Sequence, residues 1–414
     1  MKYRAAPPNV VLEVGKGVDA MRIYVDNAAT SFPKPPAVME AMVRFATECG
    51  VAPGRGSFAE AKESQRIIST CRQRMGALIN ARDDDWIVFA MNCSEALNLA
   101  IRGLLATAPR GSHAICTVME HNSVLRPYEA LASQAGLKFD VVGCDPRTCV
   151  VDPDDIRKAI RPRTRLIACA HVSNVTGTIQ PVADVAGIAR EHDIPMLIDA
   201  AQSAGHVPID VQAIGADFVA FPGHKGLMGP LGTGMLYIRG GMEKLLSTIK
   251  EGGTGVQSEI VGQPTDMPQK LEIGSQNVIG IAGLGESLAW LAEKGVASVS
   301  RHERQLGDIF FGLARQAQGL NIYCPPGGGA RTAVFSVNLP GAKPLELAQM
   351  LEAEFGVLTR AGLHCAPLAH RAIGTFPDGA CRISFGPFNT QNDARHVANA
   401  LAELAARKQV RGAA

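Results

Sequence analysis

The chain has 414 residues, of which 46% are hydrophobic and 19% charged, so it can bury a sizeable core and is not a disordered protein. Its net charge of +2 gives no reason to expect nucleic acid or an acidic membrane surface as a partner. No apolar run approaches the roughly 20 residues that span a bilayer, and Pro7, Pro8 and Asn9 interrupt the run that a signal peptide needs. We therefore expect a cytoplasmic protein with one large and one smaller domain.

The residues divide into three parts along the chain. Residues 1–22 lack periodicity and are predicted to form an N-terminal arm, followed by a large domain over 23–276 and a smaller α+β domain over 277–414. In the large domain, short apolar strands alternate with amphipathic helices, which predicts an α/β fold with a mostly parallel sheet sandwiched by helices. Its strands are expected at 22–26, 86–90, 113–118, 139–142, 166–171, 194–199, 217–221 and 235–238, and its helices at 36–47, 58–78, 94–105, 123–134, 153–160 and 182–192.

The smaller domain does not continue the regular alternation of strands and helices. Helical patterns run over 278–292, 297–316 and 344–355 and again from residue 392, and strands are expected near 321 and at 333–338 and 379–384.

The chain carries ten cysteines but no C-x-x-C pair, and the two that lie closest together, Cys144 and Cys149, have no histidine nearby. This spacing indicates neither a metal site nor a disulfide framework. Cys116 and Cys169 stand in apolar strand-like runs, which is typical of buried thiols.

One loop between two predicted strands, residues 221–234, holds a single lysine, Lys225, among five glycines and two prolines. Such a composition excludes a helix or a central strand. The P-loop spacing is absent because Gly226 follows the lysine. On the loop alone two interpretations stay open: a solvated turn, or a loop that partly desolvates Lys225 and so prepares its amine for a Schiff base.

Polar residues also follow other predicted strands. Asp199 ends the strand before the lysine loop, where an aspartate is often only a helix N-cap. A carboxylate that pairs with a pyridine nitrogen and a lysine that forms an imine are, however, the two anchors of pyridoxal phosphate. Ser94 stands at a predicted helix start suited to phosphate, and His121 and Asn174 follow two further strands. Because ligands bind at the carboxyl ends of parallel strands, we expect these residues to meet there.

With these residues in place, the chain resembles the class V aminotransferase-like, fold-type I pyridoxal phosphate enzymes. Within them it is similar to the cysteine desulfurases and selenocysteine lyases, in particular the type II desulfurases with a short cysteine loop. The likeness runs from Tyr24 to Thr390. Its most specific segments are HVSNVTGT (171–178), DAAQ (199–202), GHK (223–225) and RAGLHC (360–365).

The resemblance implies a role for each candidate residue. Lys225 would form the imine with pyridoxal phosphate, His121 would stack on the cofactor ring, and Asp199 and Gln202 would contact the pyridine nitrogen and the ring hydroxyl. The implied phosphate ligands are Ser94, the backbone around Cys93, and His224, while Ser275 would reach the phosphate of a neighbouring subunit, which implies a homodimer. The implied substrate-carboxylate ligands are Asn174 and Arg382, with Arg360 at the same mouth. Pro222 stands where the family often has a phosphate-binding serine.

Cys365 distinguishes the possible reactions. It lies in a polar, turn-rich loop with His364 beside it and Arg360 nearby, and such positive charge would favour a thiolate. The expected function is conversion of L-cysteine to L-alanine, with the sulfur left as a persulfide on Cys365 and passed to an acceptor protein. Three alternatives stay open: a selenocysteine lyase, another class V reaction such as transamination or C–S lysis of cystine or cysteine, and a non-catalytic cofactor-binding or sulfur-carrier protein.

Overall fold

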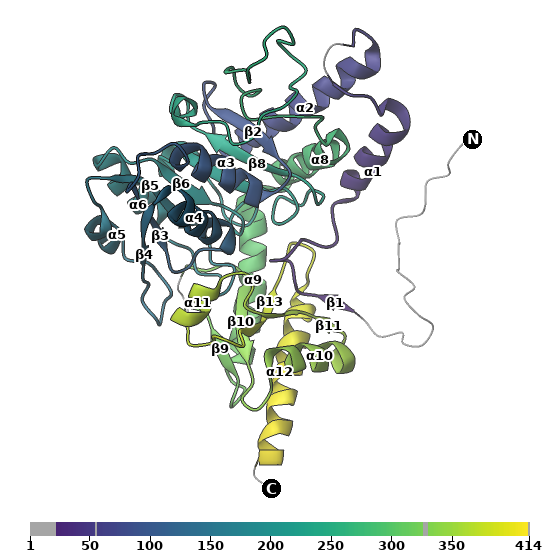
Figure 1. Cartoon of the computed structure of the whole chain (residues 1–414). Coiled ribbons are helices and arrows are strands. Elements are labelled where there is room, and N and C mark those ends of the chain that lie inside the picture. The colour runs from purple at the N-terminus through teal and green to yellow at the C-terminus, as the bar shows by residue number, and fades with distance from the viewer. Residues whose placement is uncertain (1–21, 54–55, 326–329, 413–414) are drawn as a thin grey trace.

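The computed structural model describes residues 22–53, 56–325 and 330–412, so the predicted N-terminal arm lies, except for Arg22, outside the described residues. Figure 1 shows a larger body that contains the main sheet and a smaller body that ends in the C-terminal helix, with α9 (Val296–Ala314) running between them. No helix in the described ranges is long and apolar enough to cross a membrane.

Seven strands form the main sheet in the order β2-β8-β7-β6-β5-β3-β4. Only β8 runs antiparallel to its neighbours within this sheet, so the predicted mostly parallel sheet is confirmed. β3, β6, β7 and β8 are buried along their whole length, as a sheet covered on both faces requires. The strand bounds are β2 (Trp86–Ala90), β3 (His113–Thr117), β4 (Lys138–Val142), β5 (Thr164–Ala170), β6 (Met196–Asp199), β7 (Phe218–Pro222) and β8 (Gly234–Ile238).

Alternate side chains of these strands enter two separate cores. Phe218 and Ala220 of β7 pack with α3 (Cys93–Leu105) and α4 (Asn122–Ala135) on one face, whereas Val219 and Phe221 join the core on the other face. The second face is covered by α1 (Pro36–Arg44), which continues as a π-helical turn over Phe45–Cys49, and by α2 (Ala59–Leu78), α6 (Val182–Glu191) and α8 (Val278–Lys294). Two short helices, α5 (Pro153–Ala159) and α7 (Val211–Ile214), complete this body; α7 was not predicted.

The smaller body has a four-stranded antiparallel sheet in the order β12-β13-β10-β9. Its strands are β9 (Asn321–Tyr323), β10 (Val334–Asn338), β12 (Arg360–Gly362) and β13 (Ala380–Ser384), and its helices besides α9 are α10 (Pro344–Phe355), α11 (Pro367–Ala372) and α12 (Gln391–Gly412). β1 (Ile23–Tyr24) pairs with β11 (Val357–Leu358) beside this body, while α8 packs in the core of the main sheet. The division at residues 276 and 277 therefore stays a prediction, since elements on each side of it pack with the other body.

Candidate active site

A cavity of about 260 Å³ lies at the carboxyl ends of the parallel strands, between the two bodies. Loops after β2, β3, β5, β6 and β7 form its walls on one side, and β12, β13 and the loop after β12 close the other. The structure thus brings together all the predicted site residues except Ser275: Cys93, Ser94, His121, Asn174, Asp199, Gln202, His224, Lys225, Arg360, Cys365 and Arg382.

Ser275 is exposed and lines a different hollow, together with Gly253 and Gln276. A residue that serves the phosphate of a neighbouring subunit would lie away from the cavity of its own chain. Its role stays a prediction, because a single chain does not test it.

Lys225 and Asp199 come from adjacent strands, which places both at one end of the cavity. Asp199 is the last residue of β6 and pairs with Ala220 of β7, and Lys225 follows β7 by a few residues. Burial lowers the pKa of Lys225, although the Asp199 carboxylate opposes this shift. A lysine that loses its proton more easily is a better nucleophile.

Asp199 is held in place by two donors. Its Oδ1 accepts the backbone N–H of Ala201 at 2.8 Å and the thiol of Cys93 at 3.6 Å. Burial raises the pKa of Cys93, and the nearby carboxylate raises it further, so this thiol stays protonated and remains a donor. The carboxylate is therefore fixed in orientation at the edge of the sheet where the family resemblance predicts the pyridine nitrogen.

His121 is the N-cap of α4. Its Nδ1 accepts the backbone N–H of Ser123 at 3.0 Å, which leaves the ring proton on Nε2. Burial lowers the pKa of His121, so the ring is neutral at neutral pH. The Ser123 hydroxyl also lies 2.6 Å from that of Ser94 at the start of α3, so the ring and the predicted phosphate ligand are linked.

His224, a predicted phosphate ligand, has a ring nitrogen without a hydrogen-bond partner in the described part of the chain. Nδ1 of His224 is buried and has no hydrogen-bond partner among the residues that the structure describes. Burial lowers the pKa of this histidine to about 4, and the cations of Lys225 and Lys34 add to the effect, so it stays neutral. Ser94 lines the same cavity at the N-terminus of α3, where the helix favours an anion. A helix N-terminus and a histidine with an unpaired ring nitrogen, both in the lining of one cavity, fit a phosphate group.

Arg382 is only 2% exposed, yet it carries a guanidinium at the cavity wall. One of its terminal nitrogens donates to Asp26 at 2.8 Å and the other to the backbone oxygen of Asn174 at 3.2 Å. Its Nε is buried without a hydrogen-bond partner within the described ranges. Asp26 also lies 3.5 Å from Nε of Arg360, so one carboxylate compensates both arginines. The sequence analysis gave Asp26 no role, although it lies within the segment that begins the family likeness.

Cys365 lies at the mouth of the cavity on a strained loop. All ten cysteines fall in the described ranges and are free, and Cys365 alone is exposed. His364 and Cys365 have φ of 49° and 56°, a left-handed conformation that non-glycine residues rarely adopt. Two hydrogen bonds hold them: Asn174 donates to the His364 carbonyl at 2.6 Å, and the Asn122 N–H donates to the Cys365 carbonyl at 2.7 Å.

The predicted positive charge beside Cys365 does not come from His364. This ring is buried, and its Nδ1 lies 3.2 Å from Nε2 of His370, whose own Nδ1 is 2.7 Å from the Thr375 hydroxyl. Burial lowers the pKa of His364 to about 2 and that of His370 to about 4, so both are neutral. The expectation was wrong for this residue, because a ring inside the protein loses the hydration that its charged form needs.

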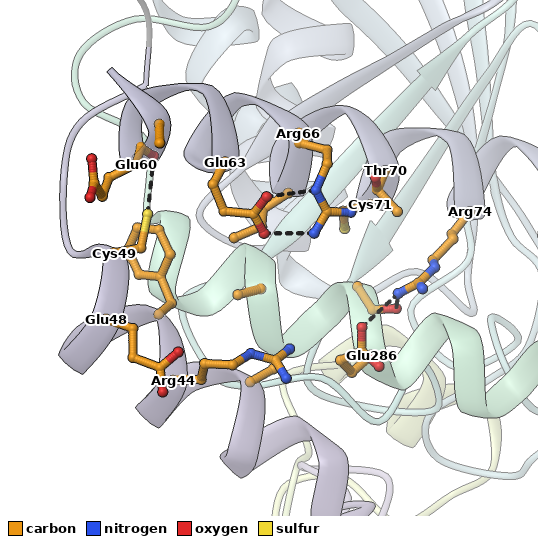
Figure 2. Close-up of a pocket in the computed structure, with 16 residues that line it drawn as sticks. Arg44, Glu48, Cys49, Glu60, Glu63, Arg66, Thr70, Cys71, Arg74 and Glu286 are labelled. Carbon is orange, nitrogen blue, oxygen red and sulfur yellow. Dashed lines mark hydrogen bonds and ion pairs between the residues drawn. The ribbon is translucent and has the colours of Figure 1, made fainter. Parts of the chain in front are cut away.

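A second cavity, of about 290 Å³, lies between α1, α2 and α8 and is shown in Figure 2. Glu63 pairs with Arg66 and Glu286 with Arg74 along its walls, and none of the predicted site residues lines it. In each of these two pairs the acidic group compensates the arginine, and we propose no reaction for this cavity.

Comparison with known proteins assigns the chain and its fold to one family. The model of the family described as aminotransferase class-V matches residues 23–397, so the chain belongs to this family and the predicted resemblance is confirmed. Its relatives are cysteine desulfurases. The Escherichia coli cysteine desulfurase CsdA is 32% identical over 92% of this chain and 93% of its own length, and a probable cysteine desulfurase of Methanothermobacter thermautotrophicus is 33% identical over 92% and 94%. The apo structure of the cysteine desulfurase from Thermococcus onnurineus superposes with a TM-score of 0.86 at 31% identity, covering 93% of this chain and 95% of that one.

Proposed function

We propose that this protein is a pyridoxal phosphate-dependent cysteine desulfurase that converts L-cysteine to L-alanine and carries the released sulfur on Cys365. One observation carries the proposal: the single exposed cysteine lies at the mouth of the cavity that also holds Lys225 and Asp199. A transaminase needs the lysine and the aspartate but has no use for a thiol at this position. The names of the relatives support the same activity.

The residues of the cavity fit pyridoxal phosphate. Lys225 would hold its aldehyde carbon, Asp199 its pyridine nitrogen, His121 its ring face, and Ser94 and His224 its phosphate. When bound, this cofactor withdraws electrons from the substrate and makes the proton on Cα acidic. Pro222 offers no hydroxyl and no N–H, and His224, whose Nδ1 has no partner among the described residues, lines the same cavity and would take over as a phosphate ligand.

The chain's own groups then divide the work. Arg382 binds the α-carboxylate of cysteine, and the amine of Lys225, whose pKa is lowered by burial, takes the Cα proton. The Cys365 thiolate attacks the substrate sulfur, so that an S–S bond forms as the Cβ–S bond breaks. The electron pair of the broken bond stays on Cβ, which gains a proton and becomes the methyl group of alanine.

The activity can be measured directly. Incubation of the purified protein with L-cysteine and a reductant should yield alanine and sulfide in equal amounts. Pyruvate and ammonia in place of alanine would indicate C–S lysis, and a keto acid formed only with an amino acceptor would indicate transamination. A parallel incubation with L-selenocysteine would measure the preference between sulfur and selenium.

The proposal includes a homodimer in the cytoplasm and an acceptor protein that takes the sulfur. Exposed apolar side chains occur on α1, at the N-cap of α2, near the start of α8 and on the 256–261 loop, and Val256 of this loop lines the hollow that contains Ser275. Such side chains are typical of an interface. Ten free thiols suit a reducing compartment.

Arg382→Lys should raise the KM for cysteine about 10- to 100-fold, since lysine cannot reproduce the planar fork that binds a carboxylate. The loss should be similar for every amino acid that the enzyme accepts, because each carries the same carboxylate. Steady-state kinetics with cysteine and selenocysteine would check this. A loss restricted to one substrate would assign Arg382 to a side-chain pocket instead.

A further inference from the structure

A buried pair of opposite charges, His206 and Glu303, is not part of the cavity lining and has no part in the steps above. Nδ1 of His206 is 2.8 and 3.0 Å from the two carboxylate oxygens of Glu303, and the two residues are 8% and 3% exposed. Burial works against the charged form of His206, but the Glu303 carboxylate prevails and raises its pKa. A buried ion pair is weak evidence for stability, because apolar residues of similar volume often serve as well. Its placement therefore indicates another use.

His206 packs directly against the loop that carries Lys225. A Cβ on Gly226, the residue after the lysine, would lie 2.2 Å from the carbonyl oxygen of Ala204 and 2.6 Å from Nε2 of His206. Gly205, with φ of 82°, is equally close, since its Cβ would lie 2.0 Å from the carbonyl oxygen of Gly226. The two backbone segments therefore pack closely, and the His206 ring lies against the residue next to Lys225.

The helix α9 runs between the two bodies (Figure 1), and Glu303 lies between the residues of α9 that join one core and those that join the other. Val299, one turn earlier, belongs to the core of the main sheet, whereas Leu306 and Phe310 pack in the core of the smaller body with Cys381 and Ile383 of β13. Arg382 stands between those two strand residues, so its side chain points to the opposite face of β13, where the cavity lies. The helix that carries Glu303 thus supports the strand that carries Arg382.

We propose that His206 and Glu303 are positioning residues that fix the Lys225 loop to α9, and thereby set the placement of Lys225 relative to Arg382. The inference rests on the proposed function, which needs one substrate held by both residues at once. Without the pair, the Lys225 loop and the strand β13 would each keep their own conformation, but their position relative to each other would change. Arg382 could then no longer bind the substrate carboxylate while Lys225 reaches the Cα proton.

The test compares two variants of His206. His206→Leu removes the donor, whereas His206→Asn places an amide N–H near the position of Nδ1 and keeps the hydrogen bond without the charge. We expect His206→Leu to lower kcat about 10- to 100-fold and to raise KM, because misplacement by about 1 Å costs about 100-fold. It should also shift the pH midpoint of the visible absorption of the lysine-bound cofactor. His206→Asn should restore most of each property.

Matched variants separate this role from others. Asp308→Asn removes a second ion pair of α9, to Arg331, that lies away from the Lys225 loop, and it should leave kcat and the midpoint unchanged. Glu303→Met, which leaves His206 buried without a partner, tests the pair from the other side if His206→Leu does not fold. Calorimetric unfolding of the cofactor-free variants gives a readout that does not depend on the activity.

The measurements on these variants either support or overturn the proposed positioning role. The proposal is supported if His206→Leu and Glu303→Met change the midpoint and both kinetic constants while His206→Asn restores them. It is overturned if both disrupting variants only lower the unfolding temperature, or if His206→Asn is as impaired as His206→Leu, since charge rather than position would then matter. A parent protein that binds no cofactor would overturn the proposed function. In that case, a calorimetric double-mutant cycle would still show whether His206 and Glu303 are coupled.

Discussion

Replacing Lys225 by alanine is expected to abolish measurable turnover of cysteine. A loss of three orders of magnitude or more corresponds to about 4 kcal/mol of activation free energy, at 1.36 kcal/mol per tenfold. Two functions fail at once, because the amine both attaches the cofactor and takes the Cα proton. Added pyridoxal phosphate should still bind through Ser94 and His224, without the visible absorption of a lysine-bound cofactor.

The measurement combines an alanine assay with the absorption spectrum of the reconstituted variant. Lys158→Ala is a suitable control, since this exposed lysine of α5 pairs with Asp155 and is not among the residues that line the cavity. It should match the parent in both assays. Normal turnover of cysteine by Lys225→Ala would show that this residue takes no part in the reaction.

Replacing Cys365 by alanine should separate cofactor chemistry from sulfur transfer. Cofactor binding should be unchanged, because the lysine and aspartate at the strand ends stay in place. Alanine formation from cysteine should fall by about two to three orders of magnitude, or about 3–4 kcal/mol, because no nucleophile attacks the sulfur. Selenocysteine should be cleaved much closer to the parent rate, since selenium is the better leaving group.

Mass spectrometry after brief exposure to cysteine without reductant provides the second readout. One added sulfur atom on the Cys365 peptide is expected in the parent, and none in the variant. Cys49→Ala is the matched control: this half-buried cysteine lies in the cavity of Figure 2 and should leave both readouts unchanged. Sulfur on another cysteine, or alanine formed at the parent rate by Cys365→Ala, would contradict the assignment to this loop.

The sequence predicts the part of the site that depends on strand ends. Asp199 ends an apolar strand and Lys225, His121 and Asn174 each follow one, and the rule that parallel strands end at one edge is enough to bring them together. The same rule could not reveal Asp26. Its ion pair with Arg382 spans 356 residues and depends on how β13 lies beside the N-terminal segment. Spacing in one chain carries no record of such a contact.

Charge states were predicted less well than positions. The sequence shows His364 next to Cys365, and a histidine in a polar loop is normally free to take a proton. Only the folded chain shows that its ring is turned inward to His370, away from water. Two short strands, β11 and β12, were also missed: they have two and three residues, too few to show an alternating pattern.

The hydrogen bonds that clamp the Cys365 loop limit how far a sulfur atom on this residue can travel. The backbone is tied at two successive carbonyls, one to the asparagine after β5 and one to the start of α4. The remaining freedom is rotation about the bonds of a single short side chain. If Cys365 carries the sulfur as proposed, the transfer cannot rely on a long movement of this loop, and the acceptor has to enter the mouth of the cavity and meet the persulfide where it forms.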